Sequence, residues 1–337
     1  MRTRKGSVRS GLQAGPAIAL LAVGLVPATA PAQITPEEAS QIRNAIGDRI
    51  EALTILGGDY GVAGATFRST GQFQFGERTD AMLGITKLGG SGEIGAPQPI
   101  GGLNIGWQPR LQGNMGAFQT ENHLHSAQFE GDVSKLSGYG LEFGGGARLW
   151  MNDAFSIAPV VTGIYGHMSS SYVAVSPFMQ ANLVRATQAG LVGWHLNTWT
   201  GVGILNMQYI VNWKRTIITL SSEPHYFHTE TANSSNPNVS ASGDSSSWAN
   251  KVDVDAPLGI QLWDHEVRGG GYFSRTDLGG ALERGLNVPY MYEVHGRLSL
   301  DFLNQLWKVQ WLGIGGSYLW GPNINGWTFG ADLKFRF

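Results

Sequence analysis

Three histidine-containing stretches hold the side chains that could do chemistry. In the first, ENHLHS, His123 and His125 lie on one face of an extended segment and precede Ser126. A histidine beside a serine can act as base and nucleophile in the cleavage of a lipid or a peptide. The stretch has no nucleophile elbow and no fixed acidic partner, and we expect it in an exposed loop. The simpler interpretation is a pair of solvated loop histidines.

The second stretch, PHYFHTE, could supply ligands for a metal ion. His225 and His228 are imidazole donors, and Glu223 or Glu230 could add a carboxylate. In a strand, however, residues three apart point to opposite faces, so a shared ion would need a bend in the chain. We therefore expect no metal site here.

The third stretch places Asp264 next to His265, an acid–imidazole pair like those of some barrel proteases. We expect it in a short turn, on the periplasmic side of the barrel that is predicted below, and an external substrate could not reach it there. We therefore predict no enzyme, no cofactor and no metal. An outer-membrane enzyme that cleaves lipid or peptide stays as an alternative.

A larger set of polar residues is spaced so that it falls on one face of strands. In NKVDVDAPLGIQL, Lys251 and Asp253 alternate with Val252 and Val254. Because successive side chains of a strand point to opposite faces, such a segment has one apolar and one polar face. The polar faces identified in this way carry Arg68, Glu142, Arg148, Lys251, Asp253, Asp255, Glu293, His295, Arg297, Asp332, Lys334 and Arg336.

Many strands with charges confined to one face indicate a transmembrane β-barrel, apolar outside and polar inside. In hydrocarbon an unpaired backbone group is costly, so strands can cross a membrane only if their sheet closes. We predict an all-β membrane protein with a twelve-stranded antiparallel barrel over residues 58–337. Period-two alternation alone also fits a soluble lectin-like or jelly-roll domain, but the export signal described below favours the membrane.

The connections between these strands alternate in length. Long connections lie outside the cell and short turns face the periplasm in outer-membrane barrels. We predict short turns near 90–97, 151–153, 211–214, 263–266 and 301–306, and longer connections near 111–136, 169–193, 232–246, 278–288 and 320–325.

The polar residues that face the lumen have two interpretations. Opposite charges can pair across strands and against a helix, which spares each the cost of an unpaired buried charge. Alternatively, they set the field of a water-filled pore and its ion preference. A twelve-stranded barrel lies between the filled eight-stranded and the open sixteen-stranded kinds. We favour pairing.

One amphipathic helix precedes the strands. In TPEEASQIRNAIGDRIEAL, Thr35 is a good N-cap, Pro36 suits the first helical position, and Glu38 completes a capping box. Apolar residues from Ile42 to Leu53 then recur at helical spacing. We assign residues 33–57 to this helix, as a plug or a linker.

The N-terminus carries an export signal over residues 1–32. Arg2, Arg4, Lys5 and Arg9 precede an apolar run, and Ala30-Pro31-Ala32 offers small residues for cleavage before Gln33. The chain has no Cys, and its net charge of −2 with no later basic cluster gives no sign of nucleic-acid binding. We predict a chain exported to the outer membrane of a Gram-negative bacterium.

The last segment, GWTFGADLKFRF, carries the most specific resemblance to a known family. Phe337, preceded by Phe335, Leu333 and Phe329, resembles the signal that outer-membrane barrels present to the barrel assembly machinery. The layout of helix and strands, above all 136–172 and 316–337, is similar to the translocator barrel of autotransporters. The resemblance implies a helix in the lumen. It also implies periplasmic chaperones as partners in assembly.

The sequence departs from that family because autotransporters carry a long passenger before the barrel, whereas here we expect only residues 33–52 or so before it, which is no passenger. We expect a solitary, autotransporter-like barrel, monomeric and in contact with outer-membrane lipid and lipopolysaccharide. Its predicted function is a non-enzymatic barrel with a narrow, helix-plugged pore. A surface adhesion or structural barrel that acts through its external loops is the other alternative.

Overall fold

The structure is a computed structural model that describes residues 36–58, 65–69, 81–101, 105–123, 130–302 and 309–335. The predicted signal peptide, His125, Ser126, Arg336 and Phe337 lie outside these ranges. At Arg68 and at 332–335 the backbone alone is described.

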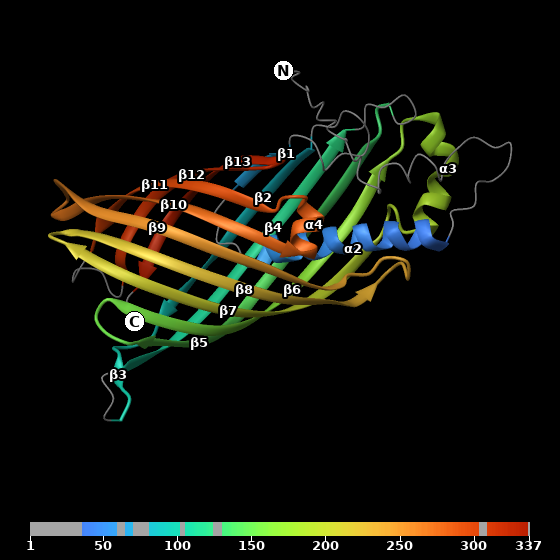
Figure 1. The fold of residues 1–337 in the computed structure, drawn as a ribbon. Coiled ribbons are helices and arrows are strands. Elements are labelled where there is room, and N and C mark those ends of the chain that lie inside the picture. Colours follow the sequence, from blue (N-terminus) through green and yellow to red (C-terminus); the bar gives the residue numbers. More distant parts are fainter. Residues whose placement is uncertain are drawn as a thin grey trace, which may run out of the picture.

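The described residues form one antiparallel sheet that closes on itself (Figure 1). β1 pairs with β13 on one side and with β2 on the other, and β2 pairs with β4, so that twelve of the described strands complete a ring. These strands are β1 (Ala65–Ser69), β2 (Ala81–Glu93), β4 (Gly106–His123), β5 (Val133–Trp150), β6 (Phe155–Val173), β7 (His195–Trp213), β8 (Thr216–Ser234), β9 (Ser242–Leu262), β10 (His265–Gly280), β11 (Tyr290–Asp301), β12 (Val309–Gly321) and β13 (Ile324–Phe335). The predicted twelve-stranded barrel is confirmed. The two-residue β3 (Gln98–Pro99) pairs with β4 at its first residues and stays outside the ring.

Connection lengths distinguish the two ends of the barrel, with one exception: the connection between β2 and β4, at 94–105, is longer than the short turn that we predicted near 90–97. Residues 151–154, 214–215 and 263–264 are tight turns at one end, and the last of these has positive φ at both Trp263 and Asp264, as a type I′ turn requires. The connections after β6, β8 and β10 are longer and lie at the other end. Because long connections face the exterior in outer-membrane barrels, this second end is the external one.

Several connections are shorter than the sequence predicts, among them the one between β8 and β9, which spans 235–241 and not 232–246. Strand β4 continues to His123 and β5 begins at Val133, where we expected a loop over 111–136. A two-residue turn at 322–323 joins β12 to β13, where we expected a longer connection. The cause is visible in β4, whose outward Gln119 and Glu121 lie near its external end. Strands that extend beyond hydrocarbon carry polar residues on both faces, and such a segment resembles a loop.

Three helices are described. The predicted helix is present as α2 (Pro36–Gly58), while α3 (Pro177–Gln188) and α4 (Ala281–Leu286) lie in external connections that we predicted as loops. None of the described helices is long and apolar enough to cross a membrane. Figure 1 shows α2 running along the inside of the barrel from the end that carries α3.

Helix α3 is fixed to the rim by one buried carboxylate. Asp132, fully buried before β5, accepts hydrogen bonds from the backbone N–H groups of Val175 (2.6 Å) and Ser176 (2.7 Å). It also accepts from the hydroxyls of Ser176 (2.7 Å) and Tyr172 (2.9 Å). Ser176 in turn caps α3 by accepting from the Met179 N–H at 3.2 Å. The Ser-Pro pair before this helix was the sequence signal that could have predicted it.

Candidate functional site: the helix in the lumen

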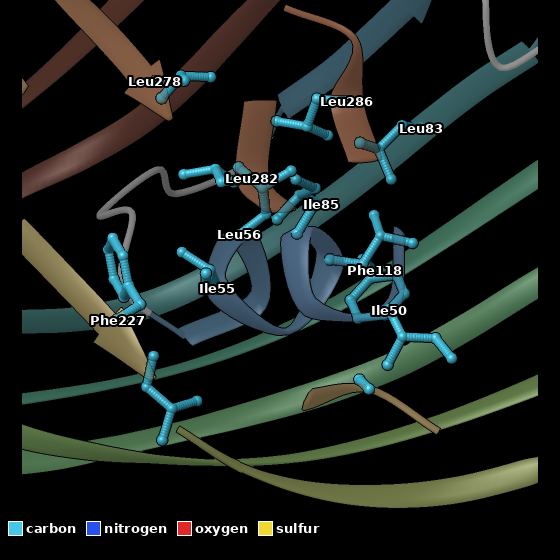
Figure 2. Close-up of a cluster of buried hydrophobic side chains, with 14 of the residues drawn as sticks. Ile50, Ile55, Leu56, Leu83, Ile85, Phe118, Phe227, Leu278, Leu282 and Leu286 are labelled. Carbon is cyan, nitrogen blue, oxygen red and sulfur yellow. The ribbon is translucent and has the colours of Figure 1, made fainter. Parts of the chain in front are cut away.

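The second half of α2 is enclosed by the barrel wall. Every residue from Ile50 to Leu56 is buried, on all sides of the helix. A helix that is buried all round must meet apolar surface in every direction. Figure 2 shows where this surface comes from, with side chains of several strands and of α4 around the helix. The buried cluster includes Phe118 of β4, Ile164 of β6, Phe227 of β8 and Leu282 of α4.

The helix points its N-terminal end to the exterior. A Cβ at Gly47 would lie 2.9 Å from the carbonyl oxygen of Ser240, in the external connection between β8 and β9. One turn later Glu51 contacts Ser245, inside the first residues of β9. The chain therefore descends into the lumen as its number increases.

Two polar residues of the enclosed segment have partners in the wall. The Thr54 hydroxyl donates to the Ile50 carbonyl oxygen at 3.0 Å and lies 3.1 Å from the Thr198 Oγ1 of β7. Because a hydroxyl has a single proton, Thr198 must be the donor in the second bond. Both threonines are buried, so this pair joins α2 directly to the barrel.

The second polar residue is Glu51, which is 1% exposed. Its Oε1 accepts a hydrogen bond of 2.5 Å from the Ser245 hydroxyl, which itself accepts from the Leu282 N–H of α4 at 2.9 Å. Burial raises the pKa of the Glu51 carboxyl, against the opposing effect of the Ser245 bond. A carboxylate here is therefore less stable than it would be in water.

An ion pair joins α2 to α4 at the external end. The Arg284 guanidinium donates from Nε and Nη2 to the two oxygens of Asp48, both at 2.8 Å. Beside it, a Cβ at Gly285 would lie 2.3 Å from the Asp48 carbonyl oxygen. Only glycine lets the two helices approach so closely.

Below the helix, Glu142 and Arg148 of β5 each form hydrogen bonds with polar side chains of neighbouring strands. Glu142 is 3% exposed and accepts hydrogen bonds from Gln112 at 2.8 Å, from Thr162 at 2.7 Å and from Asn114. Its register partner on β6 is Ile164, which belongs to the buried lumen cluster. Glu142 therefore faces the lumen.

Arg148 connects four strands through its guanidinium. It is 2% exposed and donates to Glu93 Oε1 (2.7 Å), Ser156 Oγ (2.8 Å), Gln208 Oε1 (3.0 Å) and Asn206 Oδ1 (3.0 Å). A buried guanidinium is tolerated only when its donors are satisfied. These bonds fix the lower wall from β2 to β7.

The opposite wall carries a second network of paired charges. Arg297 of β11 donates from Nη1 and Nη2 to the two carboxylate oxygens of Asp253, both at 2.7 Å. Arg268 of β10 donates to Asp255 Oδ1 at 2.5 Å. Bidentate pairing of this kind is the strong geometry for arginine and carboxylate.

The remaining polar residues of this wall gather around Tyr272. Its hydroxyl donates to Glu293 at 2.8 Å, and its ring is stacked on His295 with centroids 4.7 Å apart. The Lys251 ammonium lies 5.1 Å from the centre of the same ring. His295 Nδ1 also lies 3.1 Å from the Ser317 hydroxyl of β12.

One residue of the predicted lumen set lies on the other face. The register pairs Arg68 with Asn325 and Met82, while its neighbour Phe67 pairs with lumen-facing Leu83. Arg68 therefore has an outward register, against the prediction. At this level α2 fills the lumen, and Leu83, Ile85 and Phe118 of the neighbouring strands belong to the buried cluster around it. Asp332 and Lys334 pair with Gly313 and Trp311, and nothing is described of their side chains.

The histidine stretches are separated by the fold. His225 faces inward, with Nε2 2.8 Å from Glu223 Oε1, whereas His228 faces outward, with Nδ1 2.8 Å from Asp244. His123 ends β4, 3.2 Å from Glu121. His265 lies against Phe302, with centroids 4.2 Å apart. In the part of the chain that the structure describes, no group of three or more His, Cys, Asp or Glu residues is arranged for a metal ion.

Sequence reasoning did not assign Glu93, Arg110 and Glu223 to the lumen face. Glu93 was assigned to a turn but ends β2, where it accepts from Arg110 at 2.6 Å. Glu223 accepts from the Asn206 amide as well as facing His225. All lie at period-two positions, and continuing the alternation through the predicted turn would have found Glu93.

The predicted assembly signal is described only in part. Phe329 is 73% exposed on the outer face of β13. Leu333 and Phe335 belong to the same strand, described at the backbone, and Phe337 lies outside the described residues. Its role in assembly stays a prediction.

Comparison with known proteins identifies the family. The model for the "solitary outer membrane autotransporter beta-barrel domain" matches residues 102–329, about two thirds of the chain. No curated protein matches the sequence. The transport unit of the autotransporter AIDA-I from Escherichia coli is a similar solved structure, with a TM-score of 0.54 and 10% identity over 87% of this chain and 99% of that one.

Two further solved structures are similar at lower scores. The beta domain of the Bordetella autotransporter BrkA has a TM-score of 0.49 and 13% identity over 81% of this chain and 98% of that one. The translocator domain of NalP from Neisseria meningitidis has a TM-score of 0.45 and 11% identity over 86% and 94%. With the family match and the closed twelve-stranded ring, this chain belongs to the family of solitary outer-membrane autotransporter β-barrel domains.

Proposed function

We propose that the protein is a non-enzymatic barrel of the Gram-negative outer membrane whose narrow pore is closed by α2. The observation that carries this proposal is the enclosure of Ile50–Leu56 on all sides. A helix has an overall diameter of about 10–12 Å, so one helix occupies most of the bore of a twelve-stranded barrel. The polar networks below it would line the path that opens when it moves.

The contacts that hold α2 are suited to a plug that can be displaced. Its polar contacts to its surroundings include those of Asp48, Glu51 and Thr54. The Asp48 pair is exposed on its arginine side, and exposed ion pairs contribute only about 0–1 kcal/mol. Burial of the apolar residues supplies most of the docking energy.

The signal peptide and the partners enter as parts of the same proposal. Cleavage before Gln33 would release the chain to the periplasm, where chaperones and the assembly machinery would receive it. The alternatives make other predictions: an enzyme would hydrolyse lipid or peptide, and an adhesion barrel would bind cells through external connections such as 174–194.

Single-channel recording in planar bilayers tests the proposal. The full mature chain should be closed for most of the record, and a variant without residues 33–56 should give larger, longer-lived currents. On a detergent gel, a folded barrel should migrate differently before and after boiling. This difference should be present for both the full mature chain and the deletion variant, which shows that both are folded. Silence from two folded barrels would reject the pore.

A further inference from the structure

A groove crosses the outer wall of the barrel, away from the lumen. Its volume is about 490 Å³. Along its floor, Arg275, Asn250, Ser222 and Met207 are direct register partners on β10, β9, β8 and β7. A parallel row of larger residues forms its border, and these residues are Phe273, Val252, Leu220, Tyr209 and Phe155.

The border row faces outward, toward the membrane. Phe273, Val252, Leu220 and Tyr209 are between 42% and 48% exposed although they are large and apolar. Their neighbours in sequence, such as Lys251, belong to the lumen side. Ser222 and Asn250 are short beside this row, which leaves the hollow between them.

The groove runs from one end of the barrel toward the other. Phe155 is the first residue of β6 and follows the tight turn at 151–154, at the periplasmic end. Arg275 lies near the opposite end of β10, where its guanidinium is 5.1 Å from the ring of Tyr290 and 5.8 Å from that of Tyr292. Aromatic rings of this kind mark the membrane interface in such barrels. The groove therefore connects an interfacial cation to apolar surface deeper in the bilayer.

Two polar side chains in the groove have hydrogen-bonding capacity that the described residues do not use, and hydrocarbon cannot use it either. The exposed Asn250 amide makes no side-chain hydrogen bond to any described residue. Ser222 Oγ accepts from the Trp248 indole N–H at 2.8 Å, which leaves its own proton free to be donated. An unsatisfied amide or hydroxyl facing hydrocarbon costs several kcal/mol. A ligand with hydrogen-bonding groups at this depth would remove that cost.

The cation at the end of the groove is oriented by one acid. Asp277 Oδ1 accepts from Arg275 Nε (3.1 Å) and Nη2 (2.6 Å), which leaves the Nη1 donors for a ligand. The nearby carboxylate disfavours a doubly charged phosphate monoester. It tolerates a phosphodiester, which has a single negative charge.

We propose that this groove binds one glycerophospholipid with a phosphodiester headgroup. Its phosphate lies at Arg275, an ester carbonyl accepts from the Asn250 amide, and an acyl chain follows the apolar row toward Phe155. The site is independent of α2 and of any pore.

Native mass spectrometry of the full mature chain in detergent tests the site. Dioleoylphosphatidylglycerol should give a retained one-lipid adduct, and dioleoylglycerol, which lacks the phosphate, should be retained about tenfold less. Asn250→Leu fills the groove and Arg275→Gln removes the cation, so each should lower phosphatidylglycerol retention about tenfold. The matched controls are Ser246→Leu, on the outer face of β9, and Arg185→Gln, at an exposed position of α3; both should bind as the unaltered chain does.

Arg275→Lys separates a loss of charge from a loss of fold. It keeps the charge, so it should retain more lipid than Arg275→Gln, and each variant should keep its heat-dependent gel mobility. Equal retention by the unaltered chain and Asn250→Leu would overturn the proposal. So would equal retention of phosphatidylglycerol and dioleoylglycerol, which would indicate adventitious binding of acyl chains only.

Discussion

Thr54 of α2 and Thr198 of β7 share a hydrogen bond of 3.1 Å between their hydroxyl oxygens, buried inside the lumen. The wall beside this bond is the backbone of Gly166, where a Cβ would lie 2.5 Å from the Thr198 oxygen and 2.9 Å from the Thr54 methyl carbon. The helix thus touches the barrel at a point where glycine leaves room for it. In the proposal that α2 closes the pore, this contact belongs to the closed state.

Gly166→Val should loosen the plug. Its side chain would overlap Thr54 and Thr198, and overpacking of this kind costs about 1–3 kcal/mol. We expect more frequent channel openings than in the unaltered chain. Gly201→Val is the control, since a Cβ at this outward position of β7 would meet nothing within 4 Å. Equal opening frequencies in the two variants would contradict the contact's role.

Docking of the lumen helix α2 against the barrel wall should become more stable as pH falls. Burial raises the pKa of the Glu51 carboxyl, so the carboxylate that forms above this pKa destabilises the docked helix. Below it the neutral acid is bound without that cost. A single cysteine at Ile55→Cys, in a chain that has none of its own, reports helix exposure by its labelling rate.

To isolate the effect of Glu51, the labelling rate of Ile55→Cys alone is divided at each pH by the labelling rate of Ile55→Cys combined with Glu51→Gln. The amide cannot ionise, so the ratio of rates between the two backgrounds should approach one at low pH and grow as pH rises. A ratio that does not change with pH would remove Glu51 from the control of docking.

Arg148→Met should destabilise the folded barrel by about 3–5 kcal/mol, because it leaves the carboxylate of Glu93 without one of its cationic partners in a partly buried site. It also removes the hydrogen bonds to Asn206 and Gln208. Urea titration of the barrel in lipid vesicles measures the loss. Lys251→Met is the control. The ammonium of Lys251 is exposed and lies over the Tyr272 ring, so its loss should cost about 1 kcal/mol or less.

An epitope placed directly before Pro36 should be accessible on intact cells. The N-terminal end of α2 faces the external connections, as the approach of Gly47 to Ser240 indicates. Antibody binding without permeabilisation checks this orientation, with an epitope in the turn at 214–215 as the internal control. Labelling of the turn but not of the helix would reverse the assignment of the two ends.

Period-two alternation was sufficient to predict the barrel and the lumen side of most charged residues, because both follow from local geometry. The pairing of Arg148 with Asn206 was not predictable, since it depends on how far neighbouring strands shift along one another. Alternation also failed at Arg68. There the helix fills the bore, and Leu83 and Phe118 of the neighbouring strands face inward as core residues.

External segments were the other source of error. Helix α3 depends on Asp132, which lies more than forty residues before the hydroxyl and N–H groups of Ser176 that it binds. No local pattern contains that relationship. The Ser-Pro start of the helix was readable, but its position on the rim follows only from the folded barrel.

The most direct test of the plug is a reversible covalent bond across the threonine pair. Thr54→Cys and Thr198→Cys together replace the hydrogen-bonded oxygens by sulfur in a chain without other cysteines, which makes a disulfide unambiguous. Currents through the oxidised protein should be absent, and reduction in the same bilayer should restore openings. Equal currents before and after reduction, with the disulfide verified by mass, would show that α2 does not close the pore.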